Sequence, residues 1–180
     1  MRVIAGEMGG RRLVAPSGRG TRPTTDRVRE GIFSMLGSLG LVAGARVWDL
    51  FAGSGALGIE ALSRGAAHAT LVDNARPAVL VARSNLASLG YGQERAAVVC
   101  SEVLAWVCDW GGDKPDLVLA DPPYAWRHWA SLLAELAPLA PMVVMQAGEE
   151  PALPEGWSVS RSKRYGTTVV TLASPKEGEV

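Results

Sequence analysis

Cysteine and histidine are scarce in this sequence, which contains two of each in 180 residues. A disulfide framework needs several paired cysteines, and a structural zinc site needs clustered cysteine and histidine ligands. Neither arrangement is expected here, and we expect no bound metal. We interpret Cys100 and Cys108 as buried thiols.

Long apolar runs are also missing. The longest, such as residues 117–120 and 142–145, fall far short of the ~20 residues that a membrane-spanning helix needs. The N-terminal residues become polar and Gly-rich before a signal-type apolar stretch can form. We therefore expect no membrane segment, no membrane partner and a cytoplasmic location.

The net charge of zero conceals a basic N-terminal segment. Residues 1–29 hold seven Arg against two acidic residues, so this segment carries +5 and the remaining residues carry −5. Such a segment can simply be a solvated surface. It can also bind an anionic partner such as a nucleic acid, because the guanidinium fork of Arg matches the geometry of phosphate. Both interpretations stay open.

Hydrophobic periodicity after this segment alternates between strand-like and helix-like stretches, which is typical of a parallel sheet with crossover helices. Within the segment, residues 3–5 and 11–14 flank Gly-rich turns and predict a hairpin, followed by a loop at 16–23. Thr24 or Thr25 is expected to cap a helix that ends near Gly40. The later elements are predicted as strands at 45–51, 69–73, 96–100, 116–120 and 142–146, helices at 56–64, 76–89, 103–108 and 129–136, and a hairpin of 157–163 with 167–173.

With 48% hydrophobic residues, the chain is long enough for one well-buried domain and too short for two ordinary ones. We predict a single α/β domain over residues 1–180. Its parts are a basic hairpin and loop extension at 1–23, a catalytic core at 24–173 and a tail at 174–180.

A Gly-rich loop joins the first buried strand to the next helix. Gly53, Gly55 and Gly58 have the spacing of a dinucleotide-binding loop. Asp73 follows Gly53 by 20 residues at the end of the next strand, where a carboxylate can bind ribose hydroxyls. Asp49 would repel a pyrophosphate but can meet a cationic amino group, directly or through water. Asp49, together with the motif at residues 121–124, favours S-adenosylmethionine, with a nicotinamide dehydrogenase as a poorer alternative.

The second motif is Asp121-Pro122-Pro123-Tyr124, at the end of the fourth predicted strand. Proline has a fixed φ and no N–H, so the two prolines can hold the Asp121 carboxylate and nearby carbonyl oxygens as rigid acceptors. The Tyr124 ring offers a flat surface for a base. Acceptors beside a stacking surface suit a planar exocyclic amine whose nitrogen must face an electrophile. A strand-ending turn without chemistry is the alternative interpretation.

Three blocks together resemble the RsmD-like 16S ribosomal RNA guanine-N2 methyltransferases. They are RPTTDRVRE at 22–30, DLFAGSGALGIEALSR at 49–64 and DPPY at 121–124, of which the first is the most specific. The resemblance implies a class I S-adenosylmethionine-dependent methyltransferase fold, which is a Rossmann-like α/β fold with a seven-stranded mixed sheet, here with an N-terminal hairpin extension. The sequence departs from the family at Asp73, where Glu is commoner, and at residues 145–149, which are less acidic than usual.

The resemblance also implies roles for individual residues. The catalytic residues would be Asp121, Pro122, Pro123 and Tyr124. The cofactor would be bound by Asp49, Phe51, Ala52, Gly53, Ser54, Gly55, Leu57, Asp73, Asn74, Glu102 and Val103, and the RNA by Arg11, Arg12, Arg22 and Arg27. Glu102 could instead favour the N-terminus of its helix, and Val103 could belong to the core alone.

The expected reaction is S-adenosylmethionine-dependent methylation of the exocyclic N2 amine of a specific guanine in 16S ribosomal RNA. The substrate would be the 30S subunit or a late assembly intermediate, and positioning would do most of the catalytic work. An amino-methyltransferase acting on adenine N6 of DNA and a non-catalytic RNA-binding assembly factor are the alternatives. His68 and His128 are weaker candidates, for acid–base chemistry and for a substrate contact respectively.

Overall fold

The computed structural model describes residues 1–15 and 25–176. Its centre is a mixed sheet of seven strands in the described part of the chain, in the order β3-β2-β1-β4-β5-β7-β6. The strands are β1 (Arg46–Leu50), β2 (His68–Asp73), β3 (Ala96–Cys100), β4 (Leu117–Ala120), β5 (Val143–Ala147), β6 (Trp157–Tyr165) and β7 (Thr168–Pro175). The first five are parallel, whereas β7 pairs antiparallel with both β5 and β6. The predicted seven-stranded mixed sheet is confirmed.

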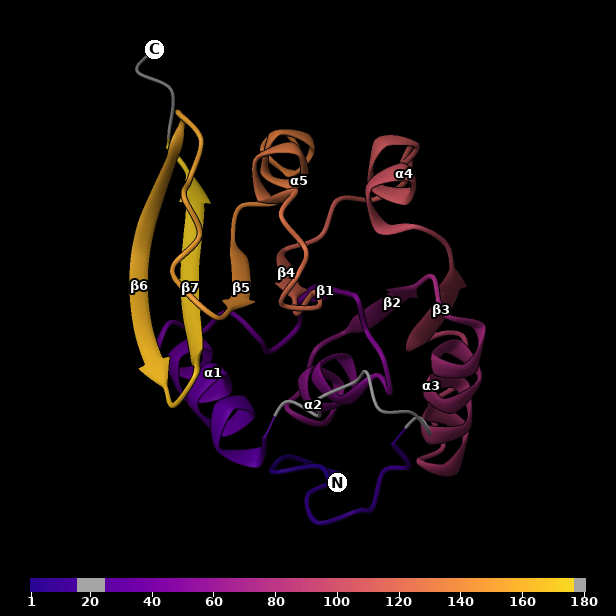
Figure 1. Cartoon of the computed structure of the whole chain (residues 1–180). Helices are drawn as coiled ribbons and strands as arrows, with labels where there is room; N and C mark the ends of the chain where they lie inside the picture. Colours follow the sequence, from indigo (N-terminus) through magenta and orange to yellow (C-terminus); the bar gives the residue numbers. More distant parts are fainter. Residues whose placement is uncertain (16–24, 177–180) are drawn as a thin grey trace.

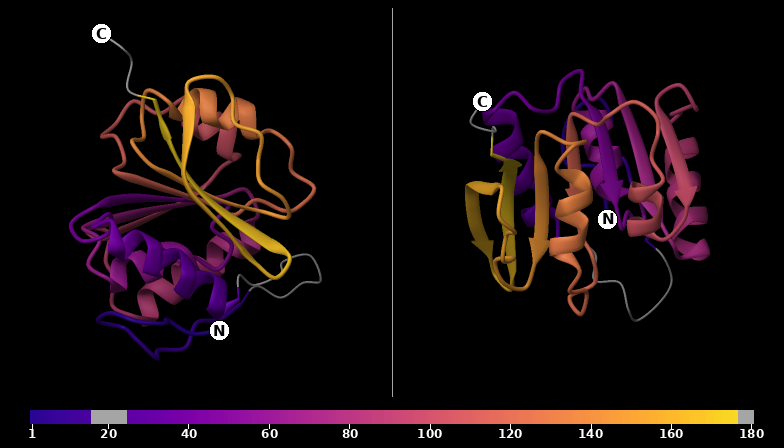
Figure 2. Two further views of the ribbon diagram at one scale, coloured as in Figure 1. Left: turned by 90° about the vertical axis from the view of Figure 1, so that its left-hand side faces the viewer. Right: turned by 90° about the horizontal axis from the view of Figure 1, so that it is seen from above.

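Helices cover both faces of this sheet (Figure 1). The helices are α1 (Asp26–Ser38), α2 (Ala56–Ser63), α3 (Arg76–Ser88), α4 (Val103–Cys108) and α5 (Trp129–Leu136). α1, α2 and α3 lie on one face, and α4 and α5 lie on the other (Figure 2). None of the helices in the described residues is long and apolar enough to cross a membrane.

Most predicted boundaries agree with the structure to within two residues at each end. The helix α1 is capped by Thr25, whose side chain accepts a hydrogen bond from the Val28 amide, while the predicted loop at 16–23 and Thr24 lie outside the described residues. One difference is at the C-terminal side, where β7 continues to Pro175 and takes in the first two residues of the predicted tail, because Ser158 and Trp157 of β6 still pair with them.

The N-terminal segment, residues 1–15, folds back on itself as predicted but does not form two strands. Its antiparallel pairing is the isolated bridge between Arg2 and Arg12. The amides of Ile4 and Ala5 donate instead to the carboxylate of Glu60 in α2. Since these N–H groups are engaged by a side chain, they cannot extend a hairpin ladder.

The prediction that both cysteines are buried was wrong, because both are exposed. Cys100 is the last residue of β3, which is an edge strand of the sheet, and Cys108 is the last residue of the short helix α4. Apolar periodicity places these residues on the correct elements, but only the sheet order shows that β3 has no strand beyond it.

Candidate functional site

The candidate site lies at the carboxyl ends of the parallel strands, beside the point between β1 and β4 where the strand order reverses. Open α/β sheets bind ligands at this position because the loops on either side diverge there. A cavity of about 760 Å³ occupies it. The predicted site residues that line this cavity are Asp49, Phe51, Ala52, Gly53, Ser54, Leu57, Asp73, Asn74, Asp121, Pro122, Pro123 and Tyr124.

Three residues predicted to bind the cofactor do not line the cavity. Gly55 has a φ of +80°, and a Cβ there would lie 2.6 Å from a methyl group of Leu71, so this glycine permits close packing of α2 on β2. The Glu102 carboxylate accepts a hydrogen bond from the Ala105 amide and caps α4. Val103 is buried in the hydrophobic core. The ligand contacts of these residues stay predictions.

The Gly-rich loop turns tightly after β1 and leaves its backbone open to the cavity. Phe51 and Gly53 have φ values of +62° and +55°, in the left-handed region. A Cβ on Gly53 would meet no atom of the described residues within 4 Å, so a ligand can approach this backbone closely. The Gly53 amide donates to one oxygen of Asp73, and the other oxygen accepts from the Ala75 amide. The loop therefore holds the Asp73 carboxylate in a fixed position at the cavity.

Asp49 is the buried acid of the site, with 1% of its surface exposed. Its Oδ2 accepts a hydrogen bond of 2.8 Å from the Gly58 amide. Its Oδ1 has no hydrogen-bond partner among the described residues. Burial raises the pKa of this carboxyl well above its ordinary value, and the nearby charges of Asp121 and Asp73 also raise it. A cationic group in the cavity would relieve this unfavourable arrangement.

Neighbouring segments hold the turn after β4, which contains the Asp121–Tyr124 motif. The Asp121 amide donates to the Leu50 carbonyl of β1, and the Trp126 amide donates to the Pro123 carbonyl. The hydroxyl of Tyr124 lies 2.9 Å from Oγ1 of Thr168 in β7. Since the hydroxyl is anchored and 46% of Tyr124 is exposed, the ring can present a face to a planar ligand.

Several residues of the cavity were missed by the sequence analysis. Gln146 near the end of β5, Tyr165 and Thr168 of the last hairpin, and Met1 all contribute to the lining. The position of Gln146 at the end of a parallel strand could have indicated its place. Tyr165 and Thr168 reach the site because β7 pairs with β5 and β6. Met1 reaches it because the N-terminal segment packs on α2.

The helix α2 anchors the N-terminal segment. Glu60 is fully buried, and its carboxylate accepts from the amides of Ile4 and Ala5 at 2.7 and 3.0 Å and from Nε of Arg64 at 2.7 Å. Ser63 Oγ donates to the Ala5 carbonyl and accepts from the Met8 amide. These contacts bring Met1 to the cavity, where its sulfur lies 3.5 Å from Ser54 Oγ.

The arginines of residues 1–29, among them the four predicted to bind RNA, have different environments. Arg11, Arg12 and Arg27 are exposed, and Arg22 lies outside the described residues. Arg29 is fully buried and donates to the Arg2 carbonyl and to Asp26. Its role is therefore structural.

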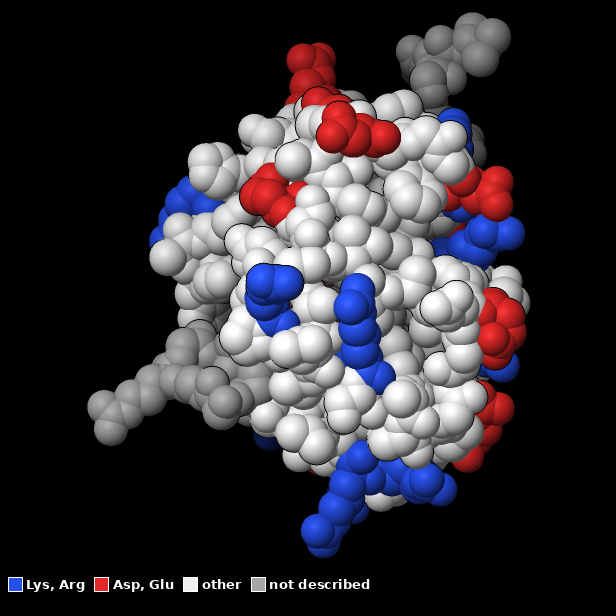
Figure 3. All heavy atoms as spheres, turned by 90° about the vertical axis from the view of Figure 1, so that its right-hand side faces the viewer, with Lys and Arg blue, Asp and Glu red and all other residues white. Residues whose placement is uncertain are grey.

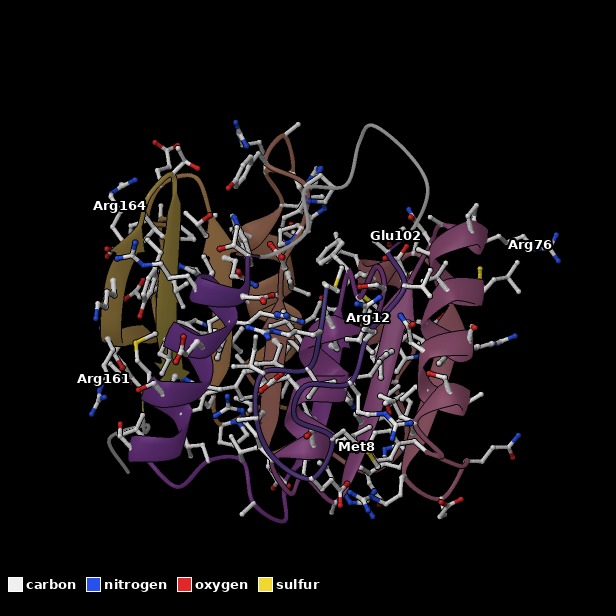
Figure 4. All side chains as sticks on the ribbon, turned by 90° about the horizontal axis from the view of Figure 1, so that it is seen from below. Met8, Arg12, Arg76, Glu102, Arg161 and Arg164 are labelled. Atoms are coloured by element: carbon white, nitrogen blue, oxygen red, sulfur yellow. The ribbon has the colours of Figure 1, made fainter. Side chains whose placement is uncertain are left out.

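Further basic residues lie on either side of the N-terminal segment, residues 1–15. Figure 4 shows Arg12 between Arg76 of α3 on one side and Arg161 and Arg164 of β6 on the other. On the face that contains α3 and β3, basic side chains lie over the middle and at the bottom, whereas acidic side chains lie near the top and along one edge (Figure 3).

The two histidines lie away from the cavity lining. His68 begins β2, at the amino end of the strand, so it lies at the opposite edge of the sheet. Its burial, together with the charge of Arg46, lowers its pKa. His128 precedes α5, and its ring lies 5.7 Å from that of Trp126. Neither residue is among those that line the cavity.

The chain is similar to a known protein family over almost its whole length. The family model described as conserved hypothetical protein 95 matches residues 1–174. The chain is 37% identical over 180 residues to "Ribosomal RNA small subunit methyltransferase D" of Escherichia coli strain K12, covering 96% of this chain and 88% of that protein.

Two solved structures are similar to this fold. The Escherichia coli protein yhhF has a TM-score of 0.85 at 36% identity, with 99% of each chain covered. The magnesium protoporphyrin IX methyltransferase of Synechocystis, solved with bound S-adenosylmethionine, has a TM-score of 0.64 at 18% identity, covering 83% of this chain and 79% of that one. The second likeness concerns the fold alone.

Proposed function

We propose the following function for this chain, which belongs to the family described as conserved hypothetical protein 95. The model of that family matches residues 1–174. The predicted RsmD-like family and the class I methyltransferase fold are confirmed. The chain is a methyltransferase of small-subunit ribosomal RNA that uses S-adenosylmethionine. Our finer proposal is that it methylates the exocyclic N2 amine of one guanine in 16S RNA, within the 30S subunit or a late assembly intermediate.

The residues of the cavity suit S-adenosylmethionine. Asp49 would face the cationic amino group of the methionine part, since its Oδ1 is buried without a partner among the described residues. Asp73 would accept from the ribose hydroxyls, because each carboxylate oxygen can accept a second hydrogen bond. The open side of Gly53 would let the ligand lie against the loop. When bound, this cofactor supplies a methyl group already activated by its sulfonium.

In the reaction, the residues of this chain position the amine. The Asp121 carboxylate and the Pro122 carbonyl would accept its two N–H groups and thereby turn the nitrogen lone pair toward the methyl group. Tyr124 would stack on the base while its hydroxyl stays bonded to Thr168. The base must leave its stack to reach this site, which costs less in an RNA loop than in a duplex.

Exposed arginines near the start of the chain support contact with RNA. Arg11 and Arg12 of the N-terminal segment and Arg27 of α1 are exposed, and all three lie within residues 1–29, which carry the excess positive charge. Fixing the segment on α2 through Glu60 would keep this charge near the cavity, because Met1 of the same segment lines it. Phosphates would then dock beside the cavity while one base enters it.

The observation that carries the proposal is the shared cavity of Asp49, Asp73 and the Asp121–Tyr124 turn. To test it, small-subunit RNA from cells that lack the protein is mapped by mass spectrometry before and after treatment with purified enzyme and S-adenosylmethionine. We expect one missing N2-methylguanosine to be restored. A restored methyladenosine, or no restored modification, would overturn the assignment to guanine N2.

A variant at the catalytic turn tests the role of the site. We expect Asp121→Ala to reduce methyl transfer at least ~10²-fold, since positioning groups of this kind contribute that much, while cofactor affinity measured by calorimetry stays nearly the same. Asp109→Ala, an exposed acid at the end of α4, is the matched control. Normal turnover of Asp121→Ala would show that Asp121 only shapes the turn.

A further inference from the structure

Gln146 is a buried polar residue of the cavity that the mechanism described above does not use. It belongs to β5, has 2% of its surface exposed and lines the cavity. Its Nε2 has no hydrogen-bond partner among the described residues. Leaving such a buried amide unpaired is unfavourable, and most buried polar groups are paired. Gln146 therefore contributes an unpaired buried donor to the residues that line the cavity.

The strand register places Gln146 beside the catalytic turn. In the parallel pairing of β4 with β5, Ala120 is opposite Met145. The next residues along the two strands are Asp121 and Gln146, and residues at matched positions of neighbouring strands share a face of the sheet. Both line the same cavity. Asp121 and Gln146 are therefore neighbours at the cavity, so a base whose amine meets Asp121 would have its adjoining edge near Gln146.

On the other side of Gln146, the last hairpin closes the site. Gln146 is paired with Val170 of β7. Two residues earlier in β7, Thr168 holds the Tyr124 hydroxyl. The amide of Gln146 is consequently enclosed between the turn that accepts the amine and the strand that fixes the stacking ring.

We propose that Gln146 is a specificity-determining residue that reads the edge of guanine next to the methylated amine, an inference that rests on the function proposed above. A primary amide has an acceptor beside a donor. Guanine has N1–H, a donor, next to its N2 amine, and O6, an acceptor, next to N1. The amide oxygen of Gln146 accepts from N1–H while Nε2 donates to O6. Pairing at both atoms distinguishes guanine from a purine that carries the same amine but lacks N1–H and O6.

The test compares guanine with 2-aminopurine, which keeps the amine at C2 but has neither N1–H nor O6. Small-subunit RNA is prepared by ligation with either base at the mapped target position and is assembled into subunits. Wild-type enzyme should methylate the guanine substrate with a kcat/KM about tenfold or more above that for 2-aminopurine, because sites built for polar groups reject analogues that lack them. Gln146→Met, which keeps the side-chain length without the amide, should reduce this preference to within about threefold.

Several controls separate this role from a purely structural one. Gln93→Met, at an exposed position outside the cavity, should keep the wild-type preference. In Gln146→Met, S-adenosylmethionine affinity should stay close to wild type, and the melting temperature should be no lower, because Met removes a buried unpaired donor. Gln146→Glu retains an acceptor for N1–H and should retain more of the preference than Gln146→Met.

The outcomes distinguish this proposal from the proposed function. If the wild-type enzyme methylates guanine and Gln146→Met keeps the full preference over 2-aminopurine, Gln146 does not read the base, although the proposed function stands. An equal loss of activity on both substrates would likewise show that Gln146 has only a structural role. If the wild-type enzyme does not methylate the guanine amine at all, the proposed function and the role of Gln146 are both wrong.

Discussion

Replacing Glu60 of α2 with alanine should strongly destabilise the protein, because this carboxylate anchors the N-terminal segment. Three donors converge on it: the amides of Ile4 and Ala5 and the Nε of Arg64. The side chain of Glu60 is fully buried, whereas 22% of the Arg64 side chain is exposed. Water can therefore rehydrate Arg64 in the variant more easily than it can replace the buried acceptor.

The expected magnitude follows from these contacts. Hydrogen bonds to a charged group contribute roughly 1.5 to 3 kcal/mol each, and losing one partner of a buried ion pair costs about 3 to 5 kcal/mol. Because the contacts share one carboxylate, they are not additive, and we expect Glu60→Ala to lower the free energy of unfolding by about 3 to 5 kcal/mol. With an m value of about 2 kcal/mol per molar, the urea midpoint falls by about 1.5 to 2.5 M.

Urea unfolding and amide hydrogen exchange measure the two parts of this prediction. Exchange at Ile4 and Ala5 should accelerate in Glu60→Ala, because their N–H groups lose their acceptor. Glu60→Gln, which retains one acceptor oxygen, should lie between the wild type and the alanine variant. Glu30→Ala, at an exposed position of α1, is the matched control with little expected effect. An unchanged urea midpoint together with unchanged exchange at Ile4 and Ala5 would refute the anchoring role.

Three further predictions concern cofactor binding, the pH dependence of stability and RNA binding. Asp73→Ala should weaken S-adenosylmethionine binding by roughly 1.5 to 3 kcal/mol in calorimetry, and an unchanged Kd would move the ribose contact to another residue. Burial raises the pKa of the Asp49 carboxyl well above its ordinary value of 3.8. The stability that protonated Asp49 contributes is therefore complete below pH 3.8 and is lost as the pH rises through the folded-state pKa. Asp49→Asn should accordingly gain stability relative to wild type with rising pH, measured by urea unfolding at several pH values, and a pH-independent difference would contradict this. Replacing Arg11 and Arg12 together with alanine should weaken RNA binding and flatten its dependence on salt by roughly one to two units of slope, whereas wild-type salt dependence would place the RNA contact elsewhere.

Much of the fold was predictable because its signals are local. Each strand of the parallel sheet is a short apolar run followed by a polar or Gly-rich turn, and each crossover helix repeats apolar residues at helical spacing. The motifs at the ends of β1, β2 and β4 were also predictable as parts of one site, since the carboxyl ends of neighbouring parallel strands meet at one edge. That rule brings Asp49, Asp73 and Asp121 to one cavity.

The mistaken and missed assignments have a common physical cause. Whether Cys100 is buried depends on what lies beyond β3, and whether residues 3–5 form a strand depends on the acceptor that their amides find. Both answers lie in distant parts of the chain. The separation is 56 residues for the hydrogen bond from Ile4 to Glu60 and 44 residues for that between Tyr124 and Thr168.

The sequence by itself determined the element order, the Gly-rich loop and the acids that mark the site, because these depend on residue type and spacing over a few turns of chain. Only the tertiary structure decided that Gln146 faces the same cavity as Asp121, that Glu60 binds the N-terminal segment and that Arg29 is buried. Register between strands and burial of a polar side chain are properties of packed elements. They arise when distant residues meet and exclude water, so no short stretch of sequence specifies them.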